Sequence, residues 1–73
     1  MPPPLLRPEA VVRAFERAGW TVVRRRASHI IMAKDGHPAT LSIPHHPTVA
    51  RGTLRSLVAR SGLSMATFLT LVD

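Results

Sequence analysis

The stretch that decides the fold of this chain is IIMAKDGHPATLSI, residues 30–43. Two apolar runs flank the dipeptide Asp35-Gly36, which is typical of a tight turn between antiparallel strands. We therefore predict a β-hairpin with one strand over residues 30–34, a two-residue loop, and a second strand over residues 39–43.

A two-residue loop determines which residues of this hairpin lie opposite each other. The predicted pairs are Lys34 with His37, Ala33 with Pro38, Met32 with Ala39, Ile31 with Thr40, Ile30 with Leu41 and His29 with Ser42. Alternation then gives an apolar face of Ile30, Met32, Ala39, Leu41 and Ile43, and an opposite face of His29, Ile31, Thr40 and Ser42. Pro38 would occupy a position without a ladder hydrogen bond, which suits an edge strand. We expect the apolar face to meet the core and His29 to lie on the open face.

Upstream of the hairpin, the sequence predicts one helix and one strand. Pro8 suits the first turn of a helix, and Gly19 suits the left-handed position that follows one. Apolar residues recur between them at Val11, Val12, Phe15 and Ala18. This spacing predicts an amphipathic helix of roughly eleven residues. The β-branched run Thr21-Val22-Val23-Arg24 then predicts a strand.

Downstream of the hairpin, the pattern becomes helical again. Thr53 is a good N-cap, and Leu54, Leu57 and Val58 follow at helical spacing. Gly62 is expected to end this helix, and Ser64 can cap a short final one. We therefore predict an α+β fold of order αβββα, with a three-stranded antiparallel sheet, helices packed on one face, and a possible short extra C-terminal helix. Residues 1–73 form a single domain in this prediction, and residues 1–7 are expected to be a flexible N-terminus.

The composition narrows the partners. The chain has 73 residues and a formal net charge of +6, and every cation except Lys34 is arginine. Arginine suits bidentate contacts to phosphate and carboxylate, so the expected partner is a nucleic acid or an acidic protein. Cysteine is absent, which excludes disulfides and thiolate sites. The sequence shows neither a secretion signal nor an apolar run of membrane-spanning length, so we predict a cytoplasmic protein without a membrane partner.

One basic run leads directly into a histidine. Arg24, Arg25 and Arg26 precede Ala27-Ser28-His29, so guanidinium groups lie next to an imidazole that can exchange a proton near neutral pH. This combination suits acid–base chemistry on a bound polyanion, with RNA as the expected substrate. The plainer interpretation is a solvated basic turn next to an ordinary exposed histidine.

Four motifs in this order resemble the HicA mRNA interferase toxins. They are Gly19-Trp20 at the helix exit, the basic run into Ser28-His29, Ile43-Pro44-His45-His46, and Gly52-Thr53-Leu54-Arg55-Ser56-Leu57 followed by Ser61-Gly62-Leu63. The resemblance extends from about residue 8 to the end of the chain. It implies a fold similar to double-stranded-RNA-binding domains and the role of an endoribonuclease toxin, neutralised by a HicB-like antitoxin.

The resemblance also implies a catalytic residue. In the family, the histidine of a Gly-Ser-His motif is catalytic, and it corresponds to His29 here. This sequence has Ala27 where the family usually has glycine, a residue that suits a positive φ or a close backbone approach to RNA.

RNA cleavage needs little from the protein, because the 2′-hydroxyl of RNA can attack the adjacent phosphorus. A histidine can transfer the protons and arginines can stabilise the developing charge. We therefore predict cleavage of mRNA with His29 as general acid/base and with no metal or small-molecule cofactor. The candidate RNA-binding residues are Arg24, Arg25, Arg26, Ser28, His46, Arg51, Thr53 and Arg55.

Several alternatives remain at this point. Thr53 could serve only as a helix cap, and Trp20 could stack on a base, although a core position is more usual for an aromatic residue after a helix end. A metal site is not expected, because His37 is predicted at the opposite end of its strand from His45 and His46. As a whole, the chain could instead be a non-catalytic double-stranded-RNA-binding module or a basic protein–protein adaptor.

Overall fold

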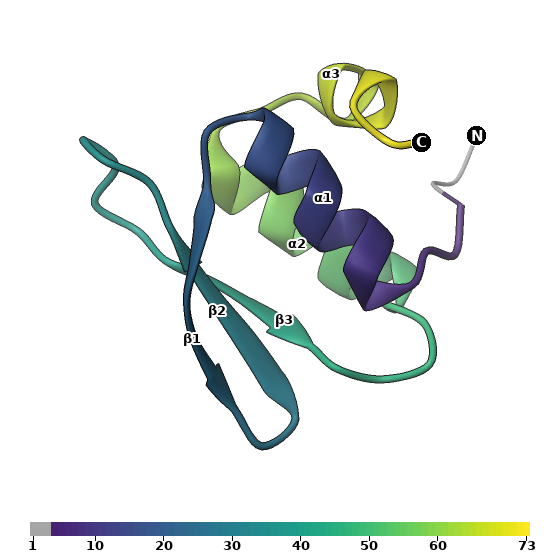
Figure 1. Cartoon of the computed structure of the whole chain (residues 1–73). Helices are drawn as coiled ribbons and strands as arrows, with labels where there is room; N and C mark the ends of the chain where they lie inside the picture. The colour runs from purple at the N-terminus through teal and green to yellow at the C-terminus, as the bar shows by residue number, and fades with distance from the viewer. Residues whose placement is uncertain (1–3) are drawn as a thin grey trace.

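The computed structural model describes residues 4–73. The elements are α1 (Pro8–Arg17), β1 (Thr21–Arg26), β2 (His29–Ala33), β3 (Leu41–Pro44), α2 (Arg51–Ser61) and α3 (Met65–Thr70). The strands form one antiparallel sheet in the order β1-β2-β3, and the helices lie on one side of it (Figure 1). This arrangement confirms the predicted α+β fold, including the short extra helix.

The core lies between this sheet and the helices. Its sheet side consists of Ile30, Met32, Leu41 and Ile43, all of which are buried. Its helix side consists chiefly of Val11 and Phe15 from α1, Leu54 and Val58 from α2, and Phe68 from α3. The rings of Phe15 and Phe68 pack with their centroids 4.9 Å apart, which connects α3 to α1. The apolar face predicted from alternation is therefore the core face, except that Ala39 lies outside the strands.

The end of α1 is closed by a glycine motif. Gly19 has a φ of +96°, and its N–H donates to the carbonyl of Glu16 at 3.0 Å. The Trp20 N–H donates to the carbonyl of Phe15, also at 3.0 Å, and the two rings meet edge to face. These are the two hydrogen bonds and the hydrophobic contact of a Schellman motif. Because the Trp20 side chain is only 1% exposed, its role is in the core rather than in base stacking.

The register of the β2–β3 hairpin differs from the prediction. The observed pairs are His29 with Pro44, Ile30 with Ile43, Ile31 with Ser42 and Met32 with Leu41, a shift of two residues along β3. A shift of two keeps every side chain on its predicted face. The predicted partners of Ile30 and His29 were therefore wrong, whereas the predicted faces were right.

The turn chemistry explains this shift. The His37 N–H donates to the carbonyl of Lys34, so the turn is centred on Asp35 and Gly36 as predicted, but only Gly36 has a positive φ. The two-residue turn that Asn-Gly and Asp-Gly favour matches the twist of the flanking strands, and it needs a positive φ at both central residues. The strands therefore separate, and pairing resumes only at Met32 and Leu41. Pro38 lies in this connection, whereas the prediction had placed it in an edge strand.

The helix ends after the sheet also differ in part. Gly62 closes α2 with a φ of +85°, and the Ser64 hydroxyl accepts the Thr67 N–H at 3.1 Å at the start of α3, as predicted. The N-cap of α2 is Ala50, without a side-chain cap, so Thr53 is the third residue of the helix and not its cap. The prediction for Thr53 failed because a good capping residue three positions later does not stop a helix from starting earlier.

The segment before α1 was expected to be flexible over residues 1–7, of which residues 1–3 lie outside the described part of the chain. Among the others, Leu6 forms an isolated antiparallel bridge with Val49, and its carbonyl accepts the Val49 N–H at 2.7 Å. Leu6 also packs against the core. This contact joins the start of α1 to the loop before α2.

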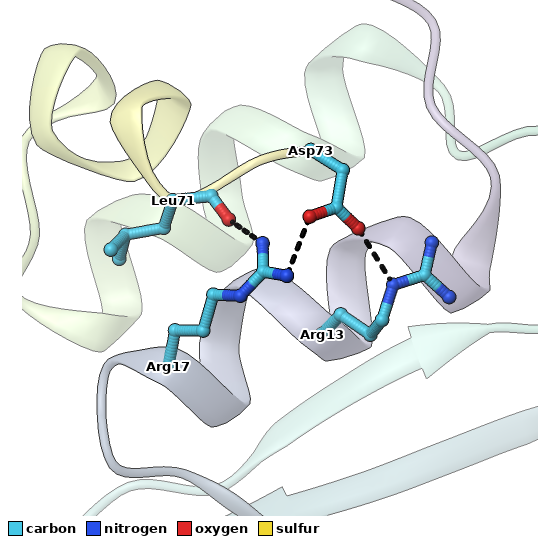
Figure 2. A network of polar contacts seen from close by, with 4 residues as sticks. All are labelled: Arg13, Arg17, Leu71 and Asp73. Carbon is cyan, nitrogen blue, oxygen red and sulfur yellow. Dashed lines mark hydrogen bonds and ion pairs between the residues drawn. The ribbon is translucent and has the colours of Figure 1, made fainter.

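The last residues are held to α1 by an arginine cluster, shown in Figure 2. Asp73 accepts the Nε–H of Arg13 at 3.0 Å and forms an ion pair with Arg17, which also donates to the Leu71 carbonyl. The hydrogen bond from Arg17, with a second from Arg13, lowers the pKa of Asp73 below its usual value. All three side chains are about half exposed, so the stabilisation is modest.

We expect the substitution Asp73→Asn to lower the melting temperature slightly at neutral pH and to make no difference in acid. A carboxyl whose pKa is depressed on folding stabilises the protein above its unfolded pKa and loses this effect as pH falls through the folded pKa. Melting curves of both proteins from pH 7 down to about 2 test this, since an unperturbed Asp titrates near 3.9. A difference in melting temperature between the two proteins that stayed constant with pH would contradict the ion-pair explanation.

Candidate nucleic-acid interface and active site

The candidate site is built on the turn between β1 and β2. Arg26 pairs with His29, so Ala27 and Ser28 form a two-residue loop at the end of the hairpin. In Figure 1 this loop projects away from the helices. Ala27 has a φ of +40°, the single positive φ of a non-glycine residue in the described chain. The backbone here has the conformation that glycine favours, and alanine adopts it at a cost of about 1–2 kcal/mol.

His29 lies on the open face of the sheet. Its neighbour Ile30 is buried against the helices, so alternation directs the His29 side chain to the opposite side, where it is exposed. The position predicted from the sequence is therefore confirmed.

The His29 ring has one polar neighbour within its own turn. The Ser28 Oγ lies 3.3 Å from His29 Nδ1. When the hydroxyl oxygen accepts a hydrogen bond from Nδ1–H, the lone pair of the neutral ring lies on Nε2, which points away from that contact. The pair can therefore present Nε2 as a base toward a ligand on the open face.

A β-bulge determines which arginines share this face. The register between β1 and β2 shifts between Val22 and Arg24, so Arg24 lies opposite Ile31, Arg25 opposite Ile30, and Arg26 opposite His29. Opposed residues share a face, which places Arg24 and Arg26 with His29 and places Arg25 on the helix side. The sequence prediction had ended the first strand at Arg24 and treated the three arginines as one cluster. The structure instead places them at the end of β1 and divides them between two faces.

The open face is basic and carries no acid. By register it includes Arg24, Arg26, His29, Ile31, Ser42 and Pro44, and neither aspartate nor glutamate occurs in any of the three strands. Pro44 pairs with His29 next to the bond from the His45 N–H to the Ser28 carbonyl, so its missing N–H faces outward. The argument made for Pro38 in an edge strand thus applies to Pro44.

The remaining RNA-binding candidates do not gather around His29. Arg51, Thr53 and Arg55 belong to α2, which packs on the helix side of the sheet. His46 follows β3 and lines an open hollow together with Arg7, Pro8, Glu9, His45 and Pro47. Sequence analysis did not predict that Arg7, Glu9 and His45 lie together, because no spacing signal connects the start of α1 with the end of β3.

His37 lies apart from the other histidines. The His37 Nδ1 accepts the Ala39 N–H at 3.1 Å, and its ring packs 4.8 Å from Trp20, at the other end of β2 from His45. Within residues 4–73, no group of three or more His, Cys, Asp or Glu side chains is placed to hold a metal ion. In the same part of the chain, none of the helices combines the length and hydrophobicity needed to cross a bilayer.

The comparison with known families matches this arrangement. The sequence model of a family described as the HicA toxin of bacterial toxin–antitoxin systems matches residues 9–63, from the first turn of α1 to just beyond α2. This chain belongs to the HicA toxin family. No curated protein matches it.

Membership in the HicA family has two consequences. The chain is a toxin, and a toxin of this kind has an antitoxin as its partner. The matched region includes the whole sheet and both loops around His29, whereas Arg7 and Pro8 of the hollow at His45 precede it and α3 lies beyond it. The third helix is therefore an addition to the matched unit, joined to it by Phe68 and by the cluster around Asp73.

In this HicA toxin, we expect Ala27→Gly to raise the free energy of unfolding by roughly 0.5–1 kcal/mol. Glycine removes the penalty of the positive φ, and this gain is partly offset by the greater freedom of the unfolded chain. Urea denaturation of the two proteins measures the difference.

The neighbouring change Ser28→Gly is the matched control, because the φ of Ser28 is not positive. It introduces the same flexibility without relieving strain, and should therefore destabilise the protein. If both glycine variants lost stability to the same extent, strain at Ala27 would be excluded.

Proposed function

We propose that this toxin is an mRNA interferase, an endoribonuclease that cleaves RNA without a metal ion. The observation that supports this most directly is the open face, where His29 is exposed beside Arg24 and Arg26 and no acid lies in the strands. A phosphate bound by the two guanidinium groups would lie next to an imidazole.

In the proposed reaction, the 2′-oxygen of one nucleotide bonds to its own 3′-phosphorus while the bond from that phosphorus to the next 5′-oxygen breaks. His29 removes the 2′-proton through Nε2, and the imidazolium can then return a proton to the leaving 5′-oxygen. Ser28 would act as a positioning residue whose hydroxyl oxygen accepts a hydrogen bond from Nδ1–H. Arg24 and Arg26 would stabilise the charge that develops on the phosphoryl oxygens.

The proposed partners follow from the same surface. mRNA in the cytoplasm is the substrate, and a HicB-like antitoxin would neutralise the toxin by covering the open face. Carboxylates of the antitoxin could pair with Arg24 and Arg26, and this complementarity would speed association and make it sensitive to salt. RNA-binding roles for Ser28, His46, Arg51, Thr53 and Arg55 remain predictions.

The substitution His29→Ala is expected to reduce RNA cleavage by a factor of about 10²–10⁴, the usual contribution of a general acid or base. Because the side chain is exposed, the free energy of unfolding should change by less than about 0.5 kcal/mol. Cleavage of a labelled mRNA and thermal melting of the same preparations measure both effects.

The variant His37→Ala provides the control for losing an imidazole, because His37 lies beside Trp20 and outside both candidate RNA surfaces, and the folded variant should keep the rate of the chemical step. A His29→Ala variant that still cleaved at the wild-type rate would exclude His29 as the catalytic group. A wild-type protein that bound RNA tightly but never cleaved it would instead be a binding module.

The products provide an independent test of the mechanism. Attack by the 2′-hydroxyl leaves a 2′,3′-cyclic phosphate and a 5′-hydroxyl, and the reaction should persist in excess chelator. An oligonucleotide with deoxyribose only at the cleaved position should bind normally but resist cleavage, because it lacks the nucleophile. Mass spectrometry of the fragments decides the point: 5′-phosphate ends, or cutting at the deoxy position, would mean that water attacks directly.

A further inference from the structure

A hollow with one arginine and two histidines lies on the helix side of the sheet, next to the β1–β2 turn. The hollow lined by Arg7, Glu9, His45 and His46 has a volume of about 460 Å³ and opens between the start of α1 and the loop after β3. The backbone N–H of His45 donates to the carbonyl of Ser28 at 2.6 Å. This bond places the hollow directly beside the residue that precedes His29.

The lining of the hollow suits a phosphate. Arg7 is a permanent cation, and the imidazoles of His45 and His46 can donate hydrogen bonds. The one acid of the lining is Glu9, whose Oε1 lies 3.7 Å from His45 Nε2. This contact is an ion pair only when His45 is protonated, and in that form the imidazolium offsets the repulsion between the carboxylate and an anion.

Arg25 extends this surface across the sheet. The bulge at Val22/Arg24 places Arg25 opposite Ile30, on the side of the sheet that the helices and the hollow share. Ile30 in turn pairs with Ile43 of β3, two residues before His45. The backbones of Arg25 and Ile43 are therefore separated by two strand spacings, or about 10 Å, and His45 lies two residues farther along the chain. This is within the reach of two long side chains that contact successive phosphates of one strand.

We propose that Arg25 and the hollow form an RNA subsite that holds phosphates of the same strand away from the cleaved bond. This proposal rests on the proposed function of the open face. The RNA would pass from His29 around the end of the β1–β2 hairpin to the helix side of the sheet. Residues 24–29, which form this end of the hairpin, include no acidic side chain. A flexible single strand with a charge on every nucleotide can follow both faces of this projecting turn. A folded acidic protein would have to be shaped to fit both faces, so we favour RNA over the antitoxin as the ligand.

The test measures binding in a protein that cannot cleave. In the His29→Ala background, the variants Arg25→Ala and Arg7→Ala are compared with Arg60→Ala, which removes the same charge from the last turn of α2. The probes are a single-stranded RNA dinucleotide and one of about ten nucleotides, titrated by fluorescence anisotropy at several salt concentrations. We expect each subsite variant to bind the longer RNA roughly three- to tenfold more weakly, with a salt slope smaller by about 0.7 per lost phosphate contact. The loss should be smaller for the dinucleotide, and Arg60→Ala should leave both affinities unchanged.

Three outcomes would overturn the subsite. The subsite variants could match Arg60→Ala, or they could weaken the dinucleotide and the longer RNA equally. They could also retain full RNA affinity while losing affinity for the antitoxin, which would assign the surface to the protein partner. Because cleavage is not measured, a failure of His29 as the catalytic group would not affect this result. Conversely, the protein could cleave RNA while the subsite variants show no length-dependent loss of binding. The subsite proposal would then fail, and the proposed cleavage would stand.

Discussion

The arrangement of this protein depends on the alternation of side chains along β2. Ile30 and Met32 are buried against the helices, and this burial prevents the strand from turning over. Exposing them would cost about 1.5–3 kcal/mol for each side chain. His29 and Ile31 must then lie on the opposite face, so the core itself directs the candidate catalytic imidazole to solvent. No side chain from another element is needed to place it there.

The neighbouring strand does not follow the same simple rule, and the bulge in β1 changes the chemistry of both faces. With regular alternation, Val22 on the core face would bring Arg24 to the helix side and Arg25 to the side of His29. The extra residue reverses this order, so Arg24 and Arg26 accompany His29. One irregularity in the ladder thus gives the open face two guanidinium groups and leaves the third on the side of the hollow.

The difference between β2 and β1 explains how much could be predicted. The faces of β2 and β3 followed from the apolar pattern. The free energy gained on burial is roughly proportional to the apolar area removed from water, so the apolar positions of a strand indicate its buried face. The strand pairing did not follow, since the φ of Asp35 depends on its tertiary surroundings and a shift of two residues leaves the pattern unchanged. The bulge left no signal either, because arginines tolerate both faces at an exposed strand end. Likewise, the hollow joins Glu9 to His45 across 36 positions of sequence, a contact that only the packed helix creates.

The backbone of His29 is held more firmly than its ring. Its backbone is held by pairing with Arg26 on one side and Pro44 on the other, and by the neighbouring bond from the His45 N–H to the Ser28 carbonyl. Within residues 4–73, the one polar side-chain contact of its ring is with the Ser28 hydroxyl, whose Oγ lies 3.3 Å from Nδ1. A fixed backbone with a lightly held ring suits a group that aligns only when a substrate is bound, as acid–base groups in unliganded enzymes often do. The bound phosphate, held by Arg24 and Arg26, would then complete an alignment that the protein alone leaves open.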